Sequence, residues 1–440
     1  MRFGSFPPIK VALSRSASTT HRAGGDDPNT NIRQLTRTIS VKDGTPLAGP
    51  ELEYNHLRDI PALENGVLVV QVNGESVRVP GQWVRDVCAC PQCRNQHTAQ
   101  RQINVFRGDI SEVSIASANV SGWPQHITVK FKDGHETVVS ASVIRNRKPH
   151  HGARQREGIV DVATWTSEIQ EDPPAVEYAD VKAGPGMASL LKTIRARGFA
   201  FVDNMPATPE ATESLLTSIG PIRNTHYGAF YDFTSDLSSK DTAYTSEALE
   251  LHTDNTYFTD PAGLQALHLL SHTDGTGGES CLVDGFAAAG QLYAQSNGAY
   301  LRLCDTGVYA HASGNDGVSI QPAQAYPTFT HSEQHKKLIQ VRWNNADRAG
   351  VATRWKQLER WYDAAAKFDA ILNDRRNQYW FQLRPGRMLL LDNWRVLHGR
   401  AAFTGKRRMC GGYINRDDFI SKFRTTNYTR EELEASTVTG

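Results

Sequence analysis

The sequence lacks any apolar run approaching the roughly 18 consecutive residues that a membrane-spanning helix requires. It also lacks a block of charge of one sign, because its 48 Lys and Arg residues are balanced by 47 Asp and Glu residues. These two absences argue against a membrane protein and against a nucleic-acid-binding protein. At 440 residues, the chain is long enough for two or three domains with at least one large core. We therefore expect a soluble globular protein.

Cysteine is scarce, with six residues in the whole chain, and its distribution is uneven. Cys88, Cys90 and Cys93 lie close together in the segment VCACPQC, whereas the other three are scattered. Clustered thiols in an intracellular chain indicate a metal site more than a disulfide framework. Three buried or surface thiols without a metal are the simpler alternative.

Acidic residues are missing from residues 1–25, which contain four basic residues together with several Ser and Thr residues. This composition is typical of a mitochondrial transit peptide. We therefore assign residues 1–50 to a leader and expect a mitochondrial protein. A disordered polar tail on a cytoplasmic protein is the alternative.

Residues 51–145 are predicted to form a small all-β domain. The segment VLVVQVNGESVRVP has Asn73-Gly74 between two alternating runs, which indicates a hairpin with a type I′ turn. The segment HITVKFKDGHETVVS repeats this pattern with Asp133-Gly134. Residues 146–180 are rich in charge, Pro and Gly and show no periodicity, so we expect a linker there.

Residues 181–430 combine short strands with a few helices. The segment GMASLLKTIRARGFAFVDNMP predicts a helix that ends at Gly198 and is followed by a strand. The segment RWKQLERWYDAAAKFDAIL is the clearest helix, with an apolar stripe of Trp355, Leu358, Tyr362, Ala365, Phe368 and Leu372. Most remaining segments are short β runs separated by turn residues. This mainly β pattern with packing helices predicts a double-stranded β-helix, the jelly-roll architecture.

Two histidines occur in apolar, strand-like runs, His252 in LELHTDNTYF and His398 in LLLDNWRVLHGR. On a strand, His252 and Asp254 would point to the same face, about 6.5 to 7 Å apart along the chain. With His398 as a third ligand, two imidazoles and one carboxylate would form the facial set of non-haem Fe(II) oxygenases. An HxD pair alone is more often structural. Arg407 and Arg408 follow closely, and an arginine fork can bind the far carboxylate of 2-oxoglutarate.

A series of motifs in the same order resembles the γ-butyrobetaine hydroxylase and trimethyllysine dioxygenase family of 2-oxoglutarate oxygenases. The motifs are DTAYTSEALELHTDNTYF, GTGGESCLVDGF, VRWNNADRA, PGRMLLLDNWRVLHGRAAFTG and CGGYINRDD. The resemblance extends from about Glu51 to Arg424. It implies an Fe(II)- and 2-oxoglutarate-dependent dioxygenase whose jelly-roll catalytic domain follows a small zinc-binding β domain.

Carried over by position, the resemblance implies that His252, Asp254 and His398 bind the iron. It implies that Arg407 binds the tail of 2-oxoglutarate, with Arg408 as the less favoured neighbour. Ser280, in the segment GGESC, stands where related enzymes often have a threonine near this cosubstrate. Dependence on ascorbate is implied by the resemblance alone.

The clustered cysteines suggest a second metal site. Cys88, Cys90 and Cys93 supply three thiolates, and His135 is the natural fourth ligand, while His97 is closer in sequence and is its rival. A closed set of three sulfurs and one nitrogen suits a structural Zn²⁺ that would stabilise a small domain. The family likewise has an N-terminal zinc domain, and its pattern favours His135.

The family acts on quaternary ammonium compounds, which are bound by a cage of aromatic faces. Suitable rings lie in the matching motifs at Tyr227, Tyr231, Tyr244 and Tyr413. Each tyrosine alone would be interpreted as a packing residue. Their alignment with the family's cage positions favours a substrate-binding role for the group.

Asp241 stands where butyrobetaine hydroxylases carry a neutral asparagine. A carboxylate there would repel the lone carboxylate of γ-butyrobetaine but would pair with the α-ammonium of Nε-trimethyllysine. Asn344 or Asn345 could then hydrogen-bond the substrate carboxylate. We therefore expect hydroxylation of trimethyllysine at C3, the first step of carnitine biosynthesis, coupled to conversion of 2-oxoglutarate into succinate and CO₂.

Two alternatives stay open at this point. The first is γ-butyrobetaine hydroxylation, the last step of carnitine biosynthesis. The second is a non-catalytic metal-binding protein of the same fold. As partners we expect a small quaternary ammonium amino acid, O₂ and a second copy of the chain in a homodimer, with no nucleic acid and no membrane.

Overall fold

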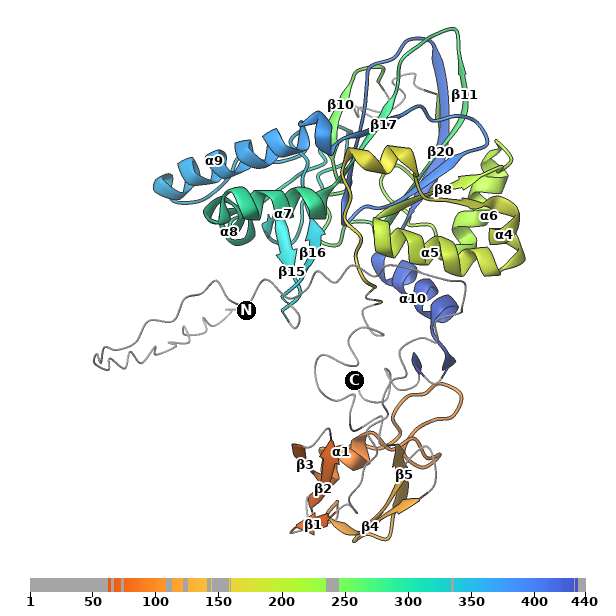
Figure 1. Cartoon of the computed structure of the whole chain (residues 1–440), viewed down its shortest axis with the longest axis vertical. Helices are drawn as coiled ribbons and strands as arrows, with labels where there is room; N and C mark the ends of the chain where they lie inside the picture. Colours follow the sequence, from red (N-terminus) through yellow and green to blue (C-terminus); the bar gives the residue numbers. More distant parts are fainter. Residues whose placement is uncertain are drawn as a thin grey trace, which may run out of the picture. The chain divides into compact units, whose positions relative to one another are not determined.

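The computed structural model describes residues 62–64, 67–72, 75–107, 113–121, 126–140, 144, 158, 160–234, 245–333, 336–430 and 432–433. These residues form an N-terminal module and a larger second domain, and each is described by itself (Figure 1). The leader predicted for residues 1–50 lies outside the described residues. Among the helices that the structure describes, none combines the length and the hydrophobicity that a membrane span requires.

The N-terminal module contains two three-stranded antiparallel sheets. Their strands are β1 (Ala62–Glu64), β2 (Val67–Val72) and β3 (Glu75–Val79), then β4 (Ile115–Ser121), β5 (His126–Phe131) and β6 (Glu136–Ser140). A short helix, α1 (Gly81–Asp86), follows β3. Alternate positions of β2, β3 and β5 contribute to one core, which includes Leu68, Val70, Val77, Val79, Ile127, Val129 and Phe131. The alternation predicted from the sequence is therefore what builds this core.

The loop of the β5–β6 hairpin is one residue longer than the two-residue Asp133-Gly134 turn that the sequence predicts. A type I′ turn would place both Asp133 and Gly134 at positive φ, but within this turn that conformation belongs to Gly134 alone, with φ of 83°. The Gly134 N–H donates to the Phe131 carbonyl (3.1 Å), and the Phe131 N–H donates to the His135 carbonyl (2.8 Å). The loop therefore has three residues, and His135 is the first residue after it. The Asn73-Gly74 turn lies outside the described residues.

The second domain is built on two β-sheets (Figure 1). The larger sheet has the order β7-β8-β18-β11-β20-β9 and the smaller sheet has the order β10-β19-β12-β17. The larger sheet contains β7 (Ala175–Glu177), β8 (Phe199–Asp203), β9 (Phe230–Thr234), β11 (Leu264–Thr273), β18 (Met388–Asp392) and β20 (Lys406–Ile414). The smaller sheet contains β10 (Leu249–His252), β12 (Ser280–Asp284), β17 (Tyr379–Phe381) and β19 (Val396–Arg400). Every adjacent pair is antiparallel except β7 and β8.

Strands from distant parts of the sequence alternate within each sheet, which is the jelly-roll topology predicted from the sequence. The fold-class prediction is confirmed. Two further sheets each have two short antiparallel strands, β13 (Gly307–Val308) with β14 (Tyr326–Pro327) and β15 (Phe329–His331) with β16 (Leu338–Val341).

The two sheets share an apolar core because successive strand residues point to opposite faces. On β18, Leu389 and Leu391 belong to the core between the sheets, while Met388 and Leu390 belong to the core on the outer face. Leu282 of β12 enters the shared core from the smaller sheet. Such strands are buried on both sides, so their sequences are continuous apolar runs.

Helices cover the outer faces of both sheets (Figure 1). The larger sheet is covered by α5 (Pro185–Arg197), α6 (Pro209–Ile219) and α10 (Arg416–Asn427). The smaller sheet is covered by α7 (Gly285–Gln295), α8 (Asn297–Asp305) and α9 (Trp355–Leu372). The α5 helix ends as predicted at Gly198, which adopts the left-handed conformation with φ of 88°.

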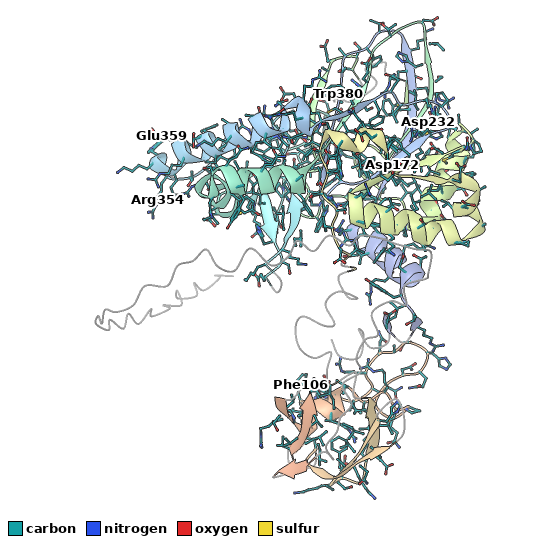
Figure 2. All side chains as sticks on the ribbon, in the orientation of Figure 1. Phe106, Asp172, Asp232, Arg354, Glu359 and Trp380 are labelled. Atoms are coloured by element: carbon teal, nitrogen blue, oxygen red, sulfur yellow. The ribbon has the colours of Figure 1, made fainter. Side chains whose placement is uncertain are left out.

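The α9 helix is present, but its buried face differs from the predicted stripe. Its buried residues are Trp361, Ala364, Ala365, Phe368, Ile371 and Leu372. Trp355 is 84% exposed and Tyr362 is 45% exposed. Arg354 and Glu359 also lie on the exposed N-terminal part of this helix (Figure 2). The stripe prediction is wrong at these two positions: Trp355 is the first residue of the helix, and Trp361 is buried where the prediction placed Tyr362.

Regular elements also occur before residue 181, within the predicted linker. A 3₁₀ helix, η1 (Ser167–Glu171), precedes β7, which pairs in parallel with β8. The short helix α4 (Tyr178–Ala183) follows β7. Elsewhere in this domain, a second 3₁₀ helix, η3 (Arg375–Asn377), precedes β17. The C-terminal part of the predicted linker is therefore ordered, because β7 extends the larger sheet.

Candidate active site and metal clusters

His252 and His398 are directly opposite each other in the β10–β19 strand pair. Directly opposed residues of antiparallel strands share a face of the sheet. The ring centroids of His252 and His398 are accordingly 4.3 Å apart. The Nδ1 atom of His252 lies 2.7 Å from the Glu250 carbonyl oxygen, to which it can donate a hydrogen bond. In the neutral imidazole, that bond leaves Nε2 free of a proton and available to a metal, as in many histidine ligands.

Asp254 does not share a strand with His252, because β10 ends at His252. The prediction that both residues lie on one strand is therefore wrong, although both side chains reach the same site. Asn393 fixes the Asp254 backbone instead. Its Oδ1 accepts from the Asp254 N–H (2.8 Å), and its Nδ2 donates to the carbonyl oxygens of Asp254 (3.0 Å) and Ala262 (3.1 Å). The next residue, Asn255, adopts positive φ (60°), which turns the chain away from the strand.

The Asp254 Oδ1 atom faces both imidazoles. It lies 3.1 Å from Nε2 of His252 and 3.8 Å from Nε2 of His398. Ligand atoms of all three residues lie within 4.8 Å of one another. Two imidazoles and one carboxylate in this arrangement can hold Fe(II) and leave other coordination positions open for ligands.

Burial and mutual charge shape the protonation of these three groups. Burial lowers the pKa of His398 to about 4, and the neighbouring His252 contributes to this shift. Burial alone would lower the pKa of His252. The hydrogen bond and the charge of Asp254 outweigh burial, so the pKa of His252 is raised. Burial would raise the pKa of Asp254, but His398 and His252 outweigh burial and hold it well below its usual range. The ionised carboxylate and the neutral His398 are the forms that bind a cation.

The second carboxylate oxygen of Asp254, Oδ2, accepts two hydrogen bonds. Gln265 Nε2 donates at 2.6 Å, and the Tyr413 hydroxyl donates at 2.7 Å. Sequence reasoning missed Gln265 and Asn393. Each of them is an amide side chain in an apolar run, Gln265 in GLQALHLL and Asn393 in LLLDNW. A buried amide needs a hydrogen-bond partner, and this could have marked both residues in the sequence.

A pocket opens beside the three candidate ligands. Its lining includes Tyr227, Tyr231, Phe233, Leu249, Tyr257, Leu267, Ser280, Leu389, Arg400, Arg407, Met409 and Tyr413. Three of the four predicted cage tyrosines therefore lie in one pocket with His252, Asp254 and His398. The fourth, Tyr244, lies outside the described residues, as does Asp241.

Aromatic side chains form one wall of this pocket. The ring centroids of Tyr231 and Tyr413 are 6.0 Å apart in an edge-to-face arrangement. Tyr231 donates its hydroxyl hydrogen to the Ala266 carbonyl, and the buried Tyr257 hydroxyl accepts from Asn255 Nδ2 (3.3 Å). Sequence reasoning missed Tyr257, although it stands within the HTDNTYF motif. Such faces can bind an alkylated ammonium group.

Arginine side chains form the cationic part of the pocket. Arg407 is 4% exposed, and burial together with the charge of Arg400 lowers its pKa to about 10, so it stays protonated at neutral pH. Its Nε has no hydrogen-bond partner among the described residues. Arg400, which sequence reasoning missed, donates to the carbonyl oxygens of Thr245 (2.8 Å) and Glu247 (2.7 Å). A buried guanidinium with an unused N–H fits a carboxylate ligand.

Arg408 points away from this pocket. Its guanidinium makes two hydrogen bonds with the carboxylate of Asp232 on β9, at 2.8 and 2.5 Å, and both side chains are partly exposed. Successive residues of β20 face opposite sides of the sheet, so Arg407 and Arg408 cannot share one pocket.

Asn344 and Asn345 are not brought into this pocket. They line a separate, neighbouring cavity with Tyr309, Tyr326 and Trp361. Asn344 Oδ1 accepts from the N–H groups of Ala346 (3.0 Å) and Asp347 (3.1 Å), and Asn345 Oδ1 accepts from Arg348 Nε (2.9 Å). Asparagine side chains commonly close local turns as Asn344 does. The sequence pattern alone does not show whether an asparagine will close a turn or bind a ligand.

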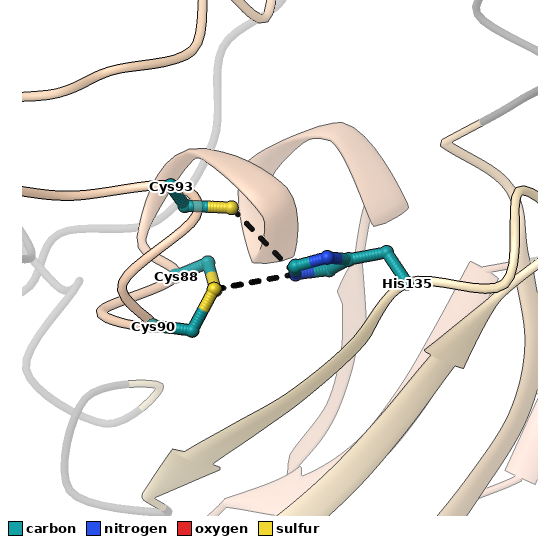
Figure 3. Close-up of side chains that lie close together, drawn as sticks. All are labelled: Cys88, Cys90, Cys93 and His135. Carbon is teal, nitrogen blue, oxygen red and sulfur yellow. Dashed lines mark hydrogen bonds between the residues drawn. The ribbon is translucent and has the colours of Figure 1, made fainter.

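The N-terminal module has a second cluster of possible ligands (Figure 3). The His135 Nε2 atom lies 3.5 Å from Cys88 Sγ, 3.8 Å from Cys90 Sγ and 3.6 Å from Cys93 Sγ. Zn–S bonds of about 2.3 Å and Zn–N bonds of about 2.0 to 2.1 Å at the tetrahedral angle imply an S···N separation of about 3.6 Å. The four side chains therefore fit a tetrahedral Zn²⁺. His97 is not part of this cluster.

Local structure explains how these four residues meet. The Cys93 N–H donates to the Cys90 carbonyl (3.0 Å), which folds the segment after α1 into a turn. The three-residue β5–β6 loop presents His135 from the other side, and Asp133 Oδ1 accepts from its N–H (2.9 Å). Burial raises the pKa of Cys93 to about 12, and neighbouring thiols add to this effect. A bound cation would provide the charge needed to hold these groups as thiolates.

Comparisons with known proteins agree with this two-part organisation. The model of the "Taurine catabolism dioxygenase TauD, TfdA family" matches residues 165–413, and that of "Gamma-butyrobetaine hydroxylase-like, N-terminal" matches residues 63–145. The trimethyllysine dioxygenase of Neurospora crassa is 41% identical over 400 residues, covering 82% of this chain and 83% of that protein. The mitochondrial trimethyllysine dioxygenase of Homo sapiens is 36% identical over 354 residues, covering 78% and 81%. The gamma-butyrobetaine dioxygenase of Homo sapiens is 26% identical over 363 residues, covering 78% and 90%.

Proposed function

The chain belongs to the TauD, TfdA family of dioxygenases together with the trimethyllysine dioxygenases, and from this membership we propose that it hydroxylates Nε-trimethyllysine at C3. It is an Fe(II)- and 2-oxoglutarate-dependent enzyme. The proposed reaction consumes trimethyllysine, 2-oxoglutarate and O₂ and yields 3-hydroxytrimethyllysine, succinate and CO₂. The observation that carries the proposal is a pocket that combines the ligand triad, aromatic faces and a buried arginine.

The alternative substrate, γ-butyrobetaine, has weaker support. Two trimethyllysine dioxygenases are 41% and 36% identical to the chain, whereas the gamma-butyrobetaine dioxygenase is 26% identical over a comparable length. The three alignments cover 78 to 82% of this chain, so the difference in identity does not depend on a single residue.

The proposed iron ligands are His252, Asp254 and His398. Fe(II) in this site supplies the activation of O₂ and the oxidative decarboxylation of 2-oxoglutarate. Arg407 would bind the far carboxylate of 2-oxoglutarate through charge-assisted hydrogen bonds. Ser280 lines the same pocket, which supports a hydrogen bond from its hydroxyl to the same carboxylate.

The aromatic wall would hold the trimethylammonium group. This group has no N–H to donate, so the negative faces of Tyr227, Tyr231 and Tyr413 would attract it, with Tyr257 beside them. Cage binding at one end fixes how far the aliphatic chain reaches, and therefore which carbon approaches the iron. The apolar side chains of the pocket exclude water from that carbon.

The α-ammonium end would be recognised by Asp241, which lies outside the described residues. The support for this role is its charge, because an aspartate complements an ammonium and repels a carboxylate. We assign no substrate contact to Asn344 or Asn345, because both line another cavity, where Asn344 closes a local turn and Asn345 accepts from the Arg348 side chain.

For the N-terminal module we propose a structural Zn²⁺ held by Cys88, Cys90, Cys93 and His135. The support is the set of three S···N separations near the tetrahedral value. Zinc would stabilise a module whose core is small. Ascorbate dependence and homodimer formation remain predictions.

We further propose a mitochondrial location. The support is that the relatives from Homo sapiens and Mus musculus are named as mitochondrial. The test is fractionation of cells expressing the tagged full chain, with a cytoplasmic signal as the contrary result.

The function is tested by succinate release from purified enzyme with Fe(II) and 2-oxoglutarate. Trimethyllysine should stimulate succinate release strongly, and mass spectrometry should detect a product heavier by one oxygen atom. γ-Butyrobetaine at the same concentration should give much less of both. Preferential hydroxylation of γ-butyrobetaine would transfer the proposal to that substrate, and an absence of succinate with either compound would contradict both.

A further inference from the structure

Asp254 holds its two carboxylate oxygens in different environments. Oδ1 faces the imidazoles of His252 and His398, at 3.1 and 3.8 Å. Oδ2 accepts hydrogen bonds from Gln265 Nε2 (2.6 Å) and the Tyr413 hydroxyl (2.7 Å). One oxygen therefore points to the proposed metal position, and the other is saturated by the protein.

The sheet itself brings the two donors together. Gln265 on β11 and Tyr413 on β20 are directly opposed residues of one antiparallel pair, so both side chains leave the sheet on the same face. Gln265 is 4% exposed and Tyr413 is 9% exposed, which removes water as a competing partner for Oδ2. A hydrogen bond to an ionised acceptor is stronger than one between neutral groups.

We propose that Gln265 and Tyr413 are positioning residues that make Asp254 a one-oxygen ligand through Oδ1. This inference rests on the proposed iron site. Carboxylates bind cations through either one or both oxygens. A carboxylate that turned to offer both oxygens would occupy a coordination position that the cosubstrate or O₂ needs.

Gln265 and Tyr413 orient the Asp254 carboxylate without help from Asn393. Asn393 fixes the main chain of Asp254 at both its N–H and its carbonyl, but it does not touch the carboxylate. The orientation of the Gln265 amide is also determined, because the reversed amide would put its oxygen against Oδ2 at 2.6 Å. Two neutral donors fix the carboxylate without neutralising its charge, so Oδ1 remains an anionic ligand.

The proposal separates two roles of Tyr413. Its ring face lines the pocket and would contact the trimethylammonium group, while its hydroxyl contacts Asp254. Tyr413→Phe removes the hydroxyl and keeps the ring. Gln265→Leu removes the amide donor and keeps much of the volume. Tyr257→Phe is the matched control, because the Tyr257 hydroxyl also lies at this pocket but accepts from Asn255 instead of contacting Asp254.

The experiment measures metal binding by the metal-free enzyme, titrated with Co²⁺ as a spectroscopic substitute for Fe²⁺. The Kd for Co²⁺ should rise about ten- to a hundredfold in Tyr413→Phe and Gln265→Leu, the usual effect of losing a group that orients a ligand. The visible absorption bands of bound Co²⁺ should also change in both variants. Tyr257→Phe should match the wild type in affinity and spectrum.

Turnover provides a second measurement. Tyr413→Phe should release more succinate per hydroxylated product, because its metal site is disturbed, while its KM for trimethyllysine should stay near the wild-type value. Wild-type Co²⁺ affinity and spectrum in both Tyr413→Phe and Gln265→Leu would overturn the inference. Unchanged Co²⁺ binding in Asp254→Ala would instead overturn the proposed iron site, and this inference with it.

Discussion

His252 and His398 face each other across the β10–β19 strand pair, with ring centroids 4.3 Å apart. Their positions differ by 146 residues in sequence, yet one register of one strand pair sets their separation. Both imidazoles line the pocket, so their ring atoms face the space for ligands, whereas the apolar cores of the sheets are built from other side chains. The ligand site and the stability of the sheets are therefore largely separate.

From this separation we predict that His398→Ala loses metal binding and turnover but keeps the fold. The substitution removes a ligand and leaves the cores intact, so the melting temperature should change by no more than a few degrees. Metal titration and thermal unfolding of the same preparation check both statements. His331→Ala, on β15 outside the pocket, should retain wild-type activity. Near-wild-type turnover in His398→Ala would remove it from the proposed ligands.

The second prediction concerns the N-terminal cluster. Purified protein should contain about one tightly held Zn²⁺ per chain, separate from exchangeable iron. Cys90→Ser should lose this zinc and lower the melting temperature, because a closed ligand set contributes to folding stability. Elemental analysis and calorimetry measure both effects. Cys304→Ser, a half-buried cysteine outside the cluster, is the control and should keep the zinc. Full zinc content in Cys90→Ser would contradict the assignment.

The third prediction uses two adjacent arginines with different environments. Arg407→Gln should raise the KM for 2-oxoglutarate about ten- to a hundredfold, because a charge-assisted hydrogen bond contributes about 1.5 to 3 kcal/mol. Arg408→Gln removes an exposed pair with Asp232 and should change the KM less than about fivefold. Steady-state kinetics with 2-oxoglutarate as the varied substrate compare the two. Equal effects of both substitutions would contradict the role of Arg407.

Much of the site could be predicted from sequence because its residues stand in strands or tight turns. The strand-like run around His398 indicates a β environment, and the VCACPQC segment with a later histidine indicates a metal cluster. Both patterns are local in the sequence, and few structures other than a β-strand and a metal site would account for them. The jelly-roll class follows similarly from many short apolar runs with few helices.

Other features depend on contacts that no local pattern encodes. Gln265 and Asn393 reach Asp254 across 11 and 139 residues of sequence, so their roles appear only when strands are paired. The Asn344 and Asn345 amides could bind a substrate, but Asn344 instead accepts from the backbone N–H groups that follow it and Asn345 accepts from the Arg348 side chain. Periodicity predicts the α9 helix but counts Trp355 as buried, because it contains no information on where the packing partner ends.

The fourth prediction tests substrate choice through Asp241. Asp241→Asn should lower kcat/KM for trimethyllysine about ten- to a hundredfold, since it removes one charge-assisted hydrogen bond to the α-ammonium. γ-Butyrobetaine lacks that ammonium, so its turnover should stay unchanged or improve. Tyr227→Ala is the control and should weaken both substrates alike, because both carry a trimethylammonium group. Equal losses for both substrates in Asp241→Asn would contradict the proposed pairing.

The last prediction concerns His268, a buried residue of β11 whose Nδ1 lies 2.7 Å from the Thr212 hydroxyl oxygen. Burial lowers its pKa to about 4, whereas an unfolded chain should titrate this histidine near its ordinary value of 6.5. Between pH 6.5 and 4 the unfolded state therefore binds more protons, and the free energy of unfolding must fall as the pH falls.

For a fully buried ring this loss should reach roughly 2 to 3 kcal/mol at pH 4. His268→Asn keeps an amide near the Nδ1 position for Thr212 but cannot take up a proton. Urea unfolding at pH 7, 5.5 and 4.5 should therefore show a shallower decline for His268→Asn than for the wild type. All other titrating groups are common to both proteins, so the difference between the two curves isolates His268. Parallel curves would mean that this histidine has the same pKa in the folded and unfolded chain.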